Sequence, residues 1–145
     1  MLEQLQPEKG DKILDIGSGS GWTTALLSEI VGEKGRVFAI EFVKELKDFG
    51  EKNTAKYNFV KKGIAKFICA DGSKGYKKEA LFDRILASAS ARKIPLAWKE
   101  QLRTGGIIVT PIEFSIWVFH KLSEKDFKEI EHPGFAFVPL VLDDK

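Results

Sequence analysis

The most constraining feature of the sequence is a short apolar run that ends in three closely spaced glycines. Residues 12–22 read Lys-Ile-Leu-Asp-Ile-Gly-Ser-Gly-Ser-Gly-Trp. The apolar positions before the first glycine suit a parallel strand that is covered on both faces. Glycines at alternate positions let the backbone take unusual dihedral angles and let a ligand approach the main chain. Beyond them, apolar residues recur at helical spacing, at Trp22, Ala25, Leu26 and Ile30.

This strand, turn and helix start favour an electron-rich ligand, because the first N–H groups of a helix lack intrahelical partners. A dinucleotide-binding fingerprint needs a third glycine where Trp22 stands. A phosphate-binding P-loop needs a Gly-Lys-Ser/Thr ending, which the stretch lacks. The remaining pattern, Asp-x-Gly-x-Gly-x-Gly, looks like the S-adenosylmethionine loop of Rossmann-type methyltransferases. A plain glycine turn that joins a strand to a helix is the alternative.

Acidic residues mark the ends of the next two predicted strands. The second strand is apolar until Glu41, and the third is followed by Asp71 and Gly72. Ligands bind at the carboxyl ends of parallel strands. A carboxylate about twenty residues past a glycine loop can accept both hydroxyls of a ribose, so Glu41 is a candidate, or else a solvated residue that opens a helix. Phe42 is placed to lie against an adenine face or to begin the helix core. Asp71 can accept the exocyclic amine of adenine while the adjacent amide reads a ring nitrogen, although Asp-Gly is also an ordinary turn.

The whole pattern predicts an α/β protein. We expect helices over about 21–31, 43–56 and 94–102, with Phe42, Leu46 and Phe49 on the inner side of the second and Cys69 as a small core residue. The expected strands cover residues 12–16, 36–41, 65–70, 82–88, 107–110, 114–122, 127–131 and 135–140. Five strands that alternate with helices, followed by a hairpin, describe a Rossmann-like, mostly parallel sheet flanked by helices with an antiparallel C-terminal hairpin.

Composition excludes several classes of protein. A net charge of +2 is too small by itself to indicate a nucleic-acid partner. The sequence has no apolar run long enough to cross a membrane, and its polar start does not resemble a signal peptide, so a cytoplasmic location is expected. His120 and His132 have no Cys, His or Asp at ligand spacing, so no metal site is predicted.

Small residues follow the fourth predicted strand, where the transferring group should lie. The chain lacks the Asn/Asp-Pro-Pro-Tyr/Phe motif that is usual in enzymes that methylate exocyclic base nitrogens or glutamine nitrogens. It also lacks the cysteine nucleophile that methylation of cytosine at C5 needs at this place. An unreactive loop suits an acceptor that is already nucleophilic, such as a carboxylate. Ser88 and Ser90 are candidate catalytic residues that donate hydrogen bonds to such an acceptor, or they are plain loop serines.

Taken together, these residues resemble the protein-L-isoaspartate O-methyltransferase family. The stretches that carry the resemblance are Leu14–Gly21, Glu41, Asp71–Tyr76, Phe82–Ile85, Gln101-Leu102 with Gly105-Gly106, and Phe137–Leu140. The resemblance implies S-adenosyl-L-methionine as cofactor. Its methionine part would be held by Asp15, Gly17, Ser18, Gly19 and Gly21 with Trp22 beside them, its ribose by Glu41 with Phe42 nearby, and its adenine by Asp71 and Gly72. Family members methylate the free carboxylate of isoaspartyl residues in damaged proteins.

The chain also departs from the family pattern. Family members carry a segment before the first strand, whereas Met1–Gln6 alone precede Pro7, so we expect a single domain over residues 1–145 that is truncated at its N-terminus. The family has mostly alanine where Ser88 and Ser90 stand, and Pro111 is not followed by the usual glycine. The acceptor therefore stays open: an isoaspartyl protein or peptide, another small carboxylate, or, for a domain that only retains the cofactor, a small molecule or RNA. A dimer or a partner chain that covers the site is a further possibility.

Overall fold

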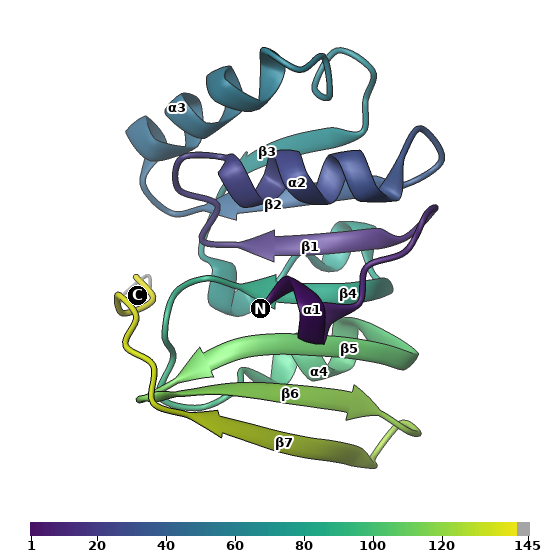
Figure 1. Ribbon diagram of the computed structural model, residues 1–145, viewed down its shortest axis with the longest axis vertical. Helices are drawn as coiled ribbons and strands as arrows, with labels where there is room; N and C mark the ends of the chain where they lie inside the picture. The colour runs from purple at the N-terminus through teal and green to yellow at the C-terminus, as the bar shows by residue number, and fades with distance from the viewer. Residues whose placement is uncertain (142–145) are drawn as a thin grey trace.

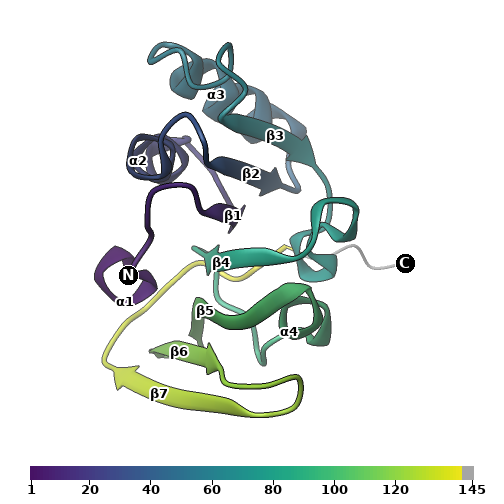
Figure 2. The same cartoon turned by 90° about the vertical axis from the view of Figure 1, so that its right-hand side faces the viewer.

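The computed structural model describes residues 1–141 as one twisted sheet with helices on its two faces (Figures 1 and 2). The helices are α1 (Leu2–Leu5), α2 (Trp22–Val31), α3 (Lys44–Ala55) and α4 (Leu96–Gln101), with short 3-10 turns η1 (Gly72–Lys74) and η2 (Lys77–Glu79). The strands are β1 (Lys12–Ile16), β2 (Arg36–Glu41), β3 (Ala65–Cys69), β4 (Phe82–Ala87), β5 (Leu102–Ile112), β6 (Ser115–Lys121) and β7 (Phe127–Pro133). None of the helices within residues 1–141 is long and apolar enough to span a membrane.

The strands lie in the order β3-β2-β1-β4-β5-β6-β7. The first five pair in parallel, and β6 and β7 add two antiparallel pairings at one edge. The predicted mostly parallel sheet with an antiparallel C-terminal hairpin is therefore confirmed. The strand order reverses direction at β1, between β2 and β4, and such a reversal opens a crevice at the carboxyl ends of the strands.

Strand β1 is apolar on both faces because helices cover both sides of the sheet. Ile13 packs into a cluster with Leu27 and Val31 of α2, whereas Leu14 belongs to a cluster on the opposite face with Trp98 of α4. Figure 2 shows α1 and α2 on one side of the sheet and α4 on the other. The near-continuous apolar run of β1 is thus explained by burial on both faces.

The predicted inner face of α3 is wrong. Phe42, Leu46 and Phe49 are 37%, 44% and 54% exposed, and the buried residues of α3 are Gly50 and Thr54. The reason is the close approach of α3 to the glycine loop, where a Cβ on Gly50 would stand 2.6 Å from the carbonyl oxygen of Gly19.

The buried face of α2 coincides only in part with the apolar residues at helical spacing in the sequence, since Ala25 is buried but Trp22 is not. Its buried residues are Thr24, Ala25, Leu27, Ser28 and Val31. Trp22, by contrast, is 65% exposed. The buried hydrogen bond from the Thr24 hydroxyl to Asp15, at 2.6 Å, fixes which face of α2 meets the sheet.

The predicted burial of Cys69 is also wrong, because β3 is an edge strand and Cys69 at its end is exposed. Strand β5 is longer than predicted and already includes Gly105 and Gly106. No strand forms over residues 135–140. This segment instead crosses the strand tips and makes an isolated bridge between Pro139 and Ser90.

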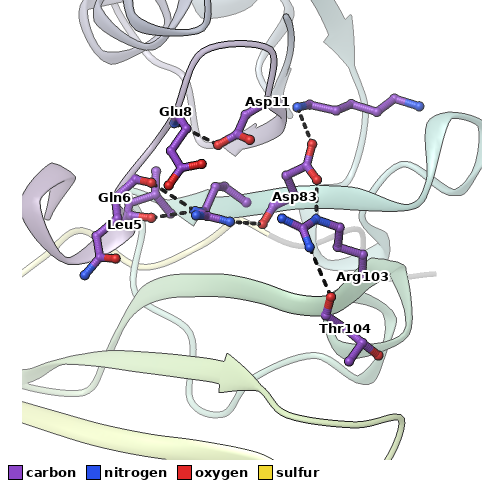
Figure 3. A network of polar contacts seen from close by, with 9 residues as sticks. Leu5, Gln6, Glu8, Asp11, Asp83, Arg103 and Thr104 are labelled. Atoms are coloured by element: carbon purple, nitrogen blue, oxygen red, sulfur yellow. Dashed lines mark hydrogen bonds and ion pairs between the residues drawn. The ribbon is translucent and has the colours of Figure 1, made fainter.

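Helix α1 is anchored to the sheet by a buried arginine. The Arg84 side chain, on β4, is 5% exposed and donates from Nε to the carbonyl oxygens of Leu5, at 2.8 Å, and Gln6, at 3.2 Å. Figure 3 shows the polar network that continues from these carbonyls to Asp83, whose carboxylate accepts bonds from the Lys12 amide and from Arg103. The guanidinium thus satisfies carbonyls that the short helix leaves free.

Candidate functional site

The glycine loop between β1 and α2 bends back over the end of β2. The Gly17 amide donates to the Ile40 carbonyl oxygen at 2.8 Å. Gly21 has a φ of +84°, and a Cβ there would stand 2.4 Å from the Gly50 carbonyl oxygen. Glycine is therefore required at position 21 both by the dihedral angle and by the space.

Glu41 reaches from the end of β2 to this loop. Its Oε1 accepts from the Gly19 amide at 3.0 Å, and its Oε2 accepts from the Phe42 amide at 2.9 Å. The structure thus brings together the glycine loop and the acid predicted to lie beside it. A carboxylate in this position, with backbone N–H groups around it, is well placed to accept hydroxyl groups.

Asp71 and Gly72 lie at the same edge of the sheet, one strand further along. The Ala70 amide donates to the Glu41 carbonyl oxygen at 3.2 Å. Asp71 caps η1: its Oδ1 accepts from both the amide, at 2.9 Å, and the hydroxyl, at 2.7 Å, of Ser73. Gly72 packs directly on β1, since a Cβ there would stand 2.4 Å from Cγ2 of Ile16.

These strand ends enclose a hollow of about 220 Å³, which we call the strand-tip cavity. Its lining includes the predicted residues Gly17, Gly19, Glu41, Phe42, Gly72 and Ser88. The sequence did not predict two further parts of the lining. These are Val43 and Leu46 at the start of α3, and the C-terminal residues 138–141, which form another wall of the cavity. In the sequence, the Phe137–Leu140 stretch carries a family resemblance but no local signal for a role in this cavity.

Two buried polar atoms at this end of β1 lack a hydrogen-bond partner in the part of the chain that the structure describes. Within residues 1–141, neither Asp15 Oδ1 nor the Ser18 hydroxyl oxygen makes a hydrogen bond. Asp15 is fully buried, and this burial raises the pKa of its carboxyl to about 6. The Thr24 hydrogen bond opposes this shift and the nearby Glu41 charge adds to it. An unpartnered carboxylate oxygen behind a glycine loop fits a ligand that carries N–H donors or an ammonium group, as the methionine part of S-adenosylmethionine does.

Three predicted residues, Gly21, Trp22 and Ser90, line hollows other than the strand-tip cavity, and Asp71 is not among the lining residues of that cavity either. Trp22 lines a separate hollow between α2 and α3, together with Gly21, Asn53 and Tyr57. Ser90 lines another cavity, of about 600 Å³.

We call this larger hollow the basic cavity, because Arg92 and Lys93 contribute to its lining, together with Ser73 and Ser90. Pro139 and Leu140 border both the basic and the strand-tip cavities. The Ser90 amide donates to the Val138 carbonyl oxygen and its carbonyl accepts from the Leu140 amide, both at 2.7 Å. The C-terminal segment therefore forms the wall between the two cavities.

The glycine loop, the acid at the end of β2 and the crevice at the reversal of strand order define a class I, Rossmann-like methyltransferase domain. The family model of the protein-L-isoaspartate(D-aspartate) O-methyltransferases matches residues 1–145. The chain therefore belongs to the protein-L-isoaspartate(D-aspartate) O-methyltransferase family.

Curated relatives extend this assignment. The protein-L-isoaspartate O-methyltransferase of Methanopyrus kandleri is 38% identical over 145 residues, which cover 97% of this chain and 63% of the relative. That of Thermococcus sibiricus is 40% identical over 147 residues, which cover 97% of this chain and 65% of the relative. The chain thus spans somewhat less than two thirds of the length of these relatives.

Solved structures agree on the fold. A protein-L-isoaspartate O-methyltransferase structure superposes with a TM-score of 0.87 and 25% identity, over 95% of this chain and 44% of the other. A Plasmodium falciparum structure assigned to the same kind of enzyme, solved in complex with S-adenosyl-L-homocysteine, gives a TM-score of 0.88 at 24% identity, over 97% of this chain and 71% of the other.

Proposed function

We propose that the chain is an S-adenosylmethionine-dependent methyltransferase that esterifies the free carboxylate of isoaspartyl residues in damaged proteins. The observation that carries the proposal is the convergence of Glu41, the glycine loop and Gly72 on one cavity in a member of this family. The relatives from Methanopyrus kandleri and Thermococcus sibiricus carry this activity in their names.

Each part of the cofactor has a matching group in the chain. The backbone of the glycine loop and the unpartnered Oδ1 of Asp15 would hold the methionine part. Glu41 would accept the ribose hydroxyls in exchange for the Gly19 amide that it now binds. Phe42 and Gly72, which line the cavity, would flank the adenine. Asp71, the residue before Gly72, would accept its exocyclic amine.

The proposed reaction needs little general acid or base catalysis from the protein. The glycine loop, Glu41 and Gly72 would hold S-adenosylmethionine, which would supply an electrophilic methyl group to the ionised carboxylate of the acceptor and leave as S-adenosylhomocysteine. An isolated carboxyl group is already ionised at neutral pH, so no general base is needed. The contribution of the chain is to orient the acceptor, an effect that is worth about 7–11 kcal/mol in well-aligned cases.

The acceptor would approach from the side of the basic cavity. Arg92 and Lys93 supply positive charge there, which attracts an anionic acceptor. Ser88 lines the strand-tip cavity and Ser90 the basic cavity, so the two serines flank the wall, bordered by Pro139 and Leu140, past which the acceptor would reach the methyl group. Their hydroxyls would hold the carboxylate by hydrogen bonds rather than activate it.

A radiolabel transfer assay tests the proposal. Purified protein, methyl-labelled S-adenosylmethionine and either of two peptides are incubated, one peptide with isoaspartate and the other with normal aspartate at the same position. We expect base-labile label on the isoaspartyl peptide alone. Label on neither peptide, with S-adenosylhomocysteine binding intact, would contradict the proposed acceptor. Failure to bind S-adenosylhomocysteine would contradict the proposal as a whole.

A further inference from the structure

The turn that carries Gly72 is held from outside the strand-tip cavity by helix α4. Gln101, at the end of α4, accepts at Oε1 from the Tyr76 amide, at 2.7 Å, and donates from Nε2 to the Lys74 carbonyl oxygen, at 3.0 Å. One turn earlier in the helix, Trp98 Nε1 donates to the carbonyl oxygen of Gly72 itself, at 2.8 Å. Three side-chain hydrogen bonds thus connect α4 to a turn that lies more than twenty residues away in the sequence.

The contact between Gln101 and the turn is closely packed. Gln101 is 7% exposed and Trp98 is fully buried. Gly75 has a φ of +63°, and a Cβ there would stand 2.2 Å from Gln101 Oε1. Gly75 thus leaves room for the amide group, and the amide in turn fixes the backbone on both sides of Gly75.

An amide is the chemical group that this position requires. It offers one acceptor and two donors in a fixed plane, so it can satisfy an N–H group and a carbonyl of the same turn. An ionised glutamate offers acceptors only, and its negative charge would repel the carbonyl oxygen of Lys74. A methionine has a similar length but replaces both bonds with apolar atoms.

We infer that Gln101 is a positioning residue, which holds the Asp71–Tyr76 turn in the shape that presents Gly72 to the nucleoside end of the cofactor. The inference rests on the proposed function, because it takes the strand-tip cavity as the cofactor site. Gln101 itself is not among the residues that line that cavity, so it acts through the turn. Loosening the turn displaces the Asp71 and Gly72 groups that read adenine, while the glycine loop, on the other side of β1, is unaffected.

The test compares two ligands that differ only in the base. Wild-type protein, Gln101→Met, Gln101→Glu and the control Glu100→Met are titrated with S-adenosylhomocysteine and with S-inosylhomocysteine, in which a carbonyl replaces the adenine amine. Glu100 is an exposed neighbour on α4 and tests for general effects on the helix. The melting temperature of each unliganded protein is recorded alongside.

We expect Gln101→Met to weaken S-adenosylhomocysteine binding by about tenfold or more and S-inosylhomocysteine binding much less, so that the preference for adenine falls. Gln101→Glu should be intermediate, and it carries the test if Gln101→Met does not fold. In methyl transfer, KM for S-adenosylmethionine should rise while kcat stays nearly constant, as for lost uniform binding. Glu100→Met should match wild type.

Two results would overturn the inference. One is a Gln101 variant that retains the wild-type affinities for both ligands. The other is an equal loss for both ligands, which would indicate a general structural role. If the wild-type protein bound neither ligand, the proposed function would fail first, and this outcome is visible without any variant.

Discussion

Asp15 is a carboxylate that the fold buries at a cost, and this cost should be measurable as a dependence of stability on pH. The side chain is fully buried with one hydrogen bond, from Thr24, and a pKa of about 6 instead of the ordinary 3.8. Asp15→Asn has nearly the same shape and can keep the Thr24 bond, but it cannot ionise. The variant therefore isolates the effect of the charge.

The direction of the effect follows from the raised pKa. Between about pH 4 and pH 6 the unfolded chain has released the Asp15 proton while the folded chain still holds it. The stability that Asp15 contributes is therefore complete below the unfolded pKa and is lost as the pH rises through the folded pKa. A shift from 3.8 to about 6 corresponds to a total loss of about 3 kcal/mol.

Urea denaturation of the unliganded protein at several pH values between 4 and 7.5 measures this loss. The free energy of unfolding of Asp15→Asn minus that of wild type should rise by about 2–3 kcal/mol over this range and then level off. Any constant cost of the new amide cancels in the difference between pH values. A difference that stays flat, or that falls with rising pH, would refute the raised pKa and with it the burial of an ionisable group behind the glycine loop.

Three further changes test other parts of the structure. Glu41→Ala should weaken S-adenosylhomocysteine binding by about 1–3 kcal/mol, because the ribose loses its acceptor, and calorimetry that shows unchanged affinity would remove this role. Gly21→Ala should destabilise the fold by about 1–3 kcal/mol more than Gly19→Ala, since both have positive φ but only a Cβ on Gly21 collides with the Gly50 backbone, and equal melting temperatures would disprove the close contact. Arg84→Met should lower the free energy of unfolding by roughly 1.5–3 kcal/mol, because it leaves the carbonyls at the end of α1 without their donor, and urea midpoints equal to wild type would contradict the anchoring of α1.

The parts of the site that have short, distinctive sequence motifs could be predicted from the sequence. The glycine loop, the acid at Glu41 and the Asp71-Gly72 turn are short motifs whose positions depend on strand ends, and the strand ends followed from apolar runs. Because parallel strands place their carboxyl ends at one edge of the sheet, the meeting of these motifs could be expected before any coordinates.

The helix faces could not be read from hydrophobicity. On α3 the apolar residues Leu46 and Phe49 remain largely exposed, because the helix approaches the glycine loop closely enough to need Gly50 at the contact. Hydrophobic periodicity predicts burial for large apolar residues and not for glycine or threonine. It therefore selects the wrong face of α3, where Gly50 and Thr54 are the buried residues. Cys69 was misplaced for a related reason, since nothing local reveals that its strand lies at the edge of the sheet.

The far side of the site also lay beyond local inference. Residues 138–141 reach the strand-tip cavity only because the chain returns across the strand tips after β7 and pairs with Ser90. The role of Gln101 likewise depends on contacts between segments that are far apart in sequence. Such long-range pairings carry no periodic signal.

The central claim is that the ends of β1, β2 and β3 together hold the cofactor. A crystal structure of this chain soaked with S-adenosylhomocysteine tests it most directly. We predict the ribose on Glu41, the homocysteine part along the glycine loop and the adenine beside Gly72. Electron density for the ligand elsewhere on the protein, or a bound ligand with the Glu41 carboxylate still engaged only with backbone amides such as those of Gly19 and Phe42, would contradict the account.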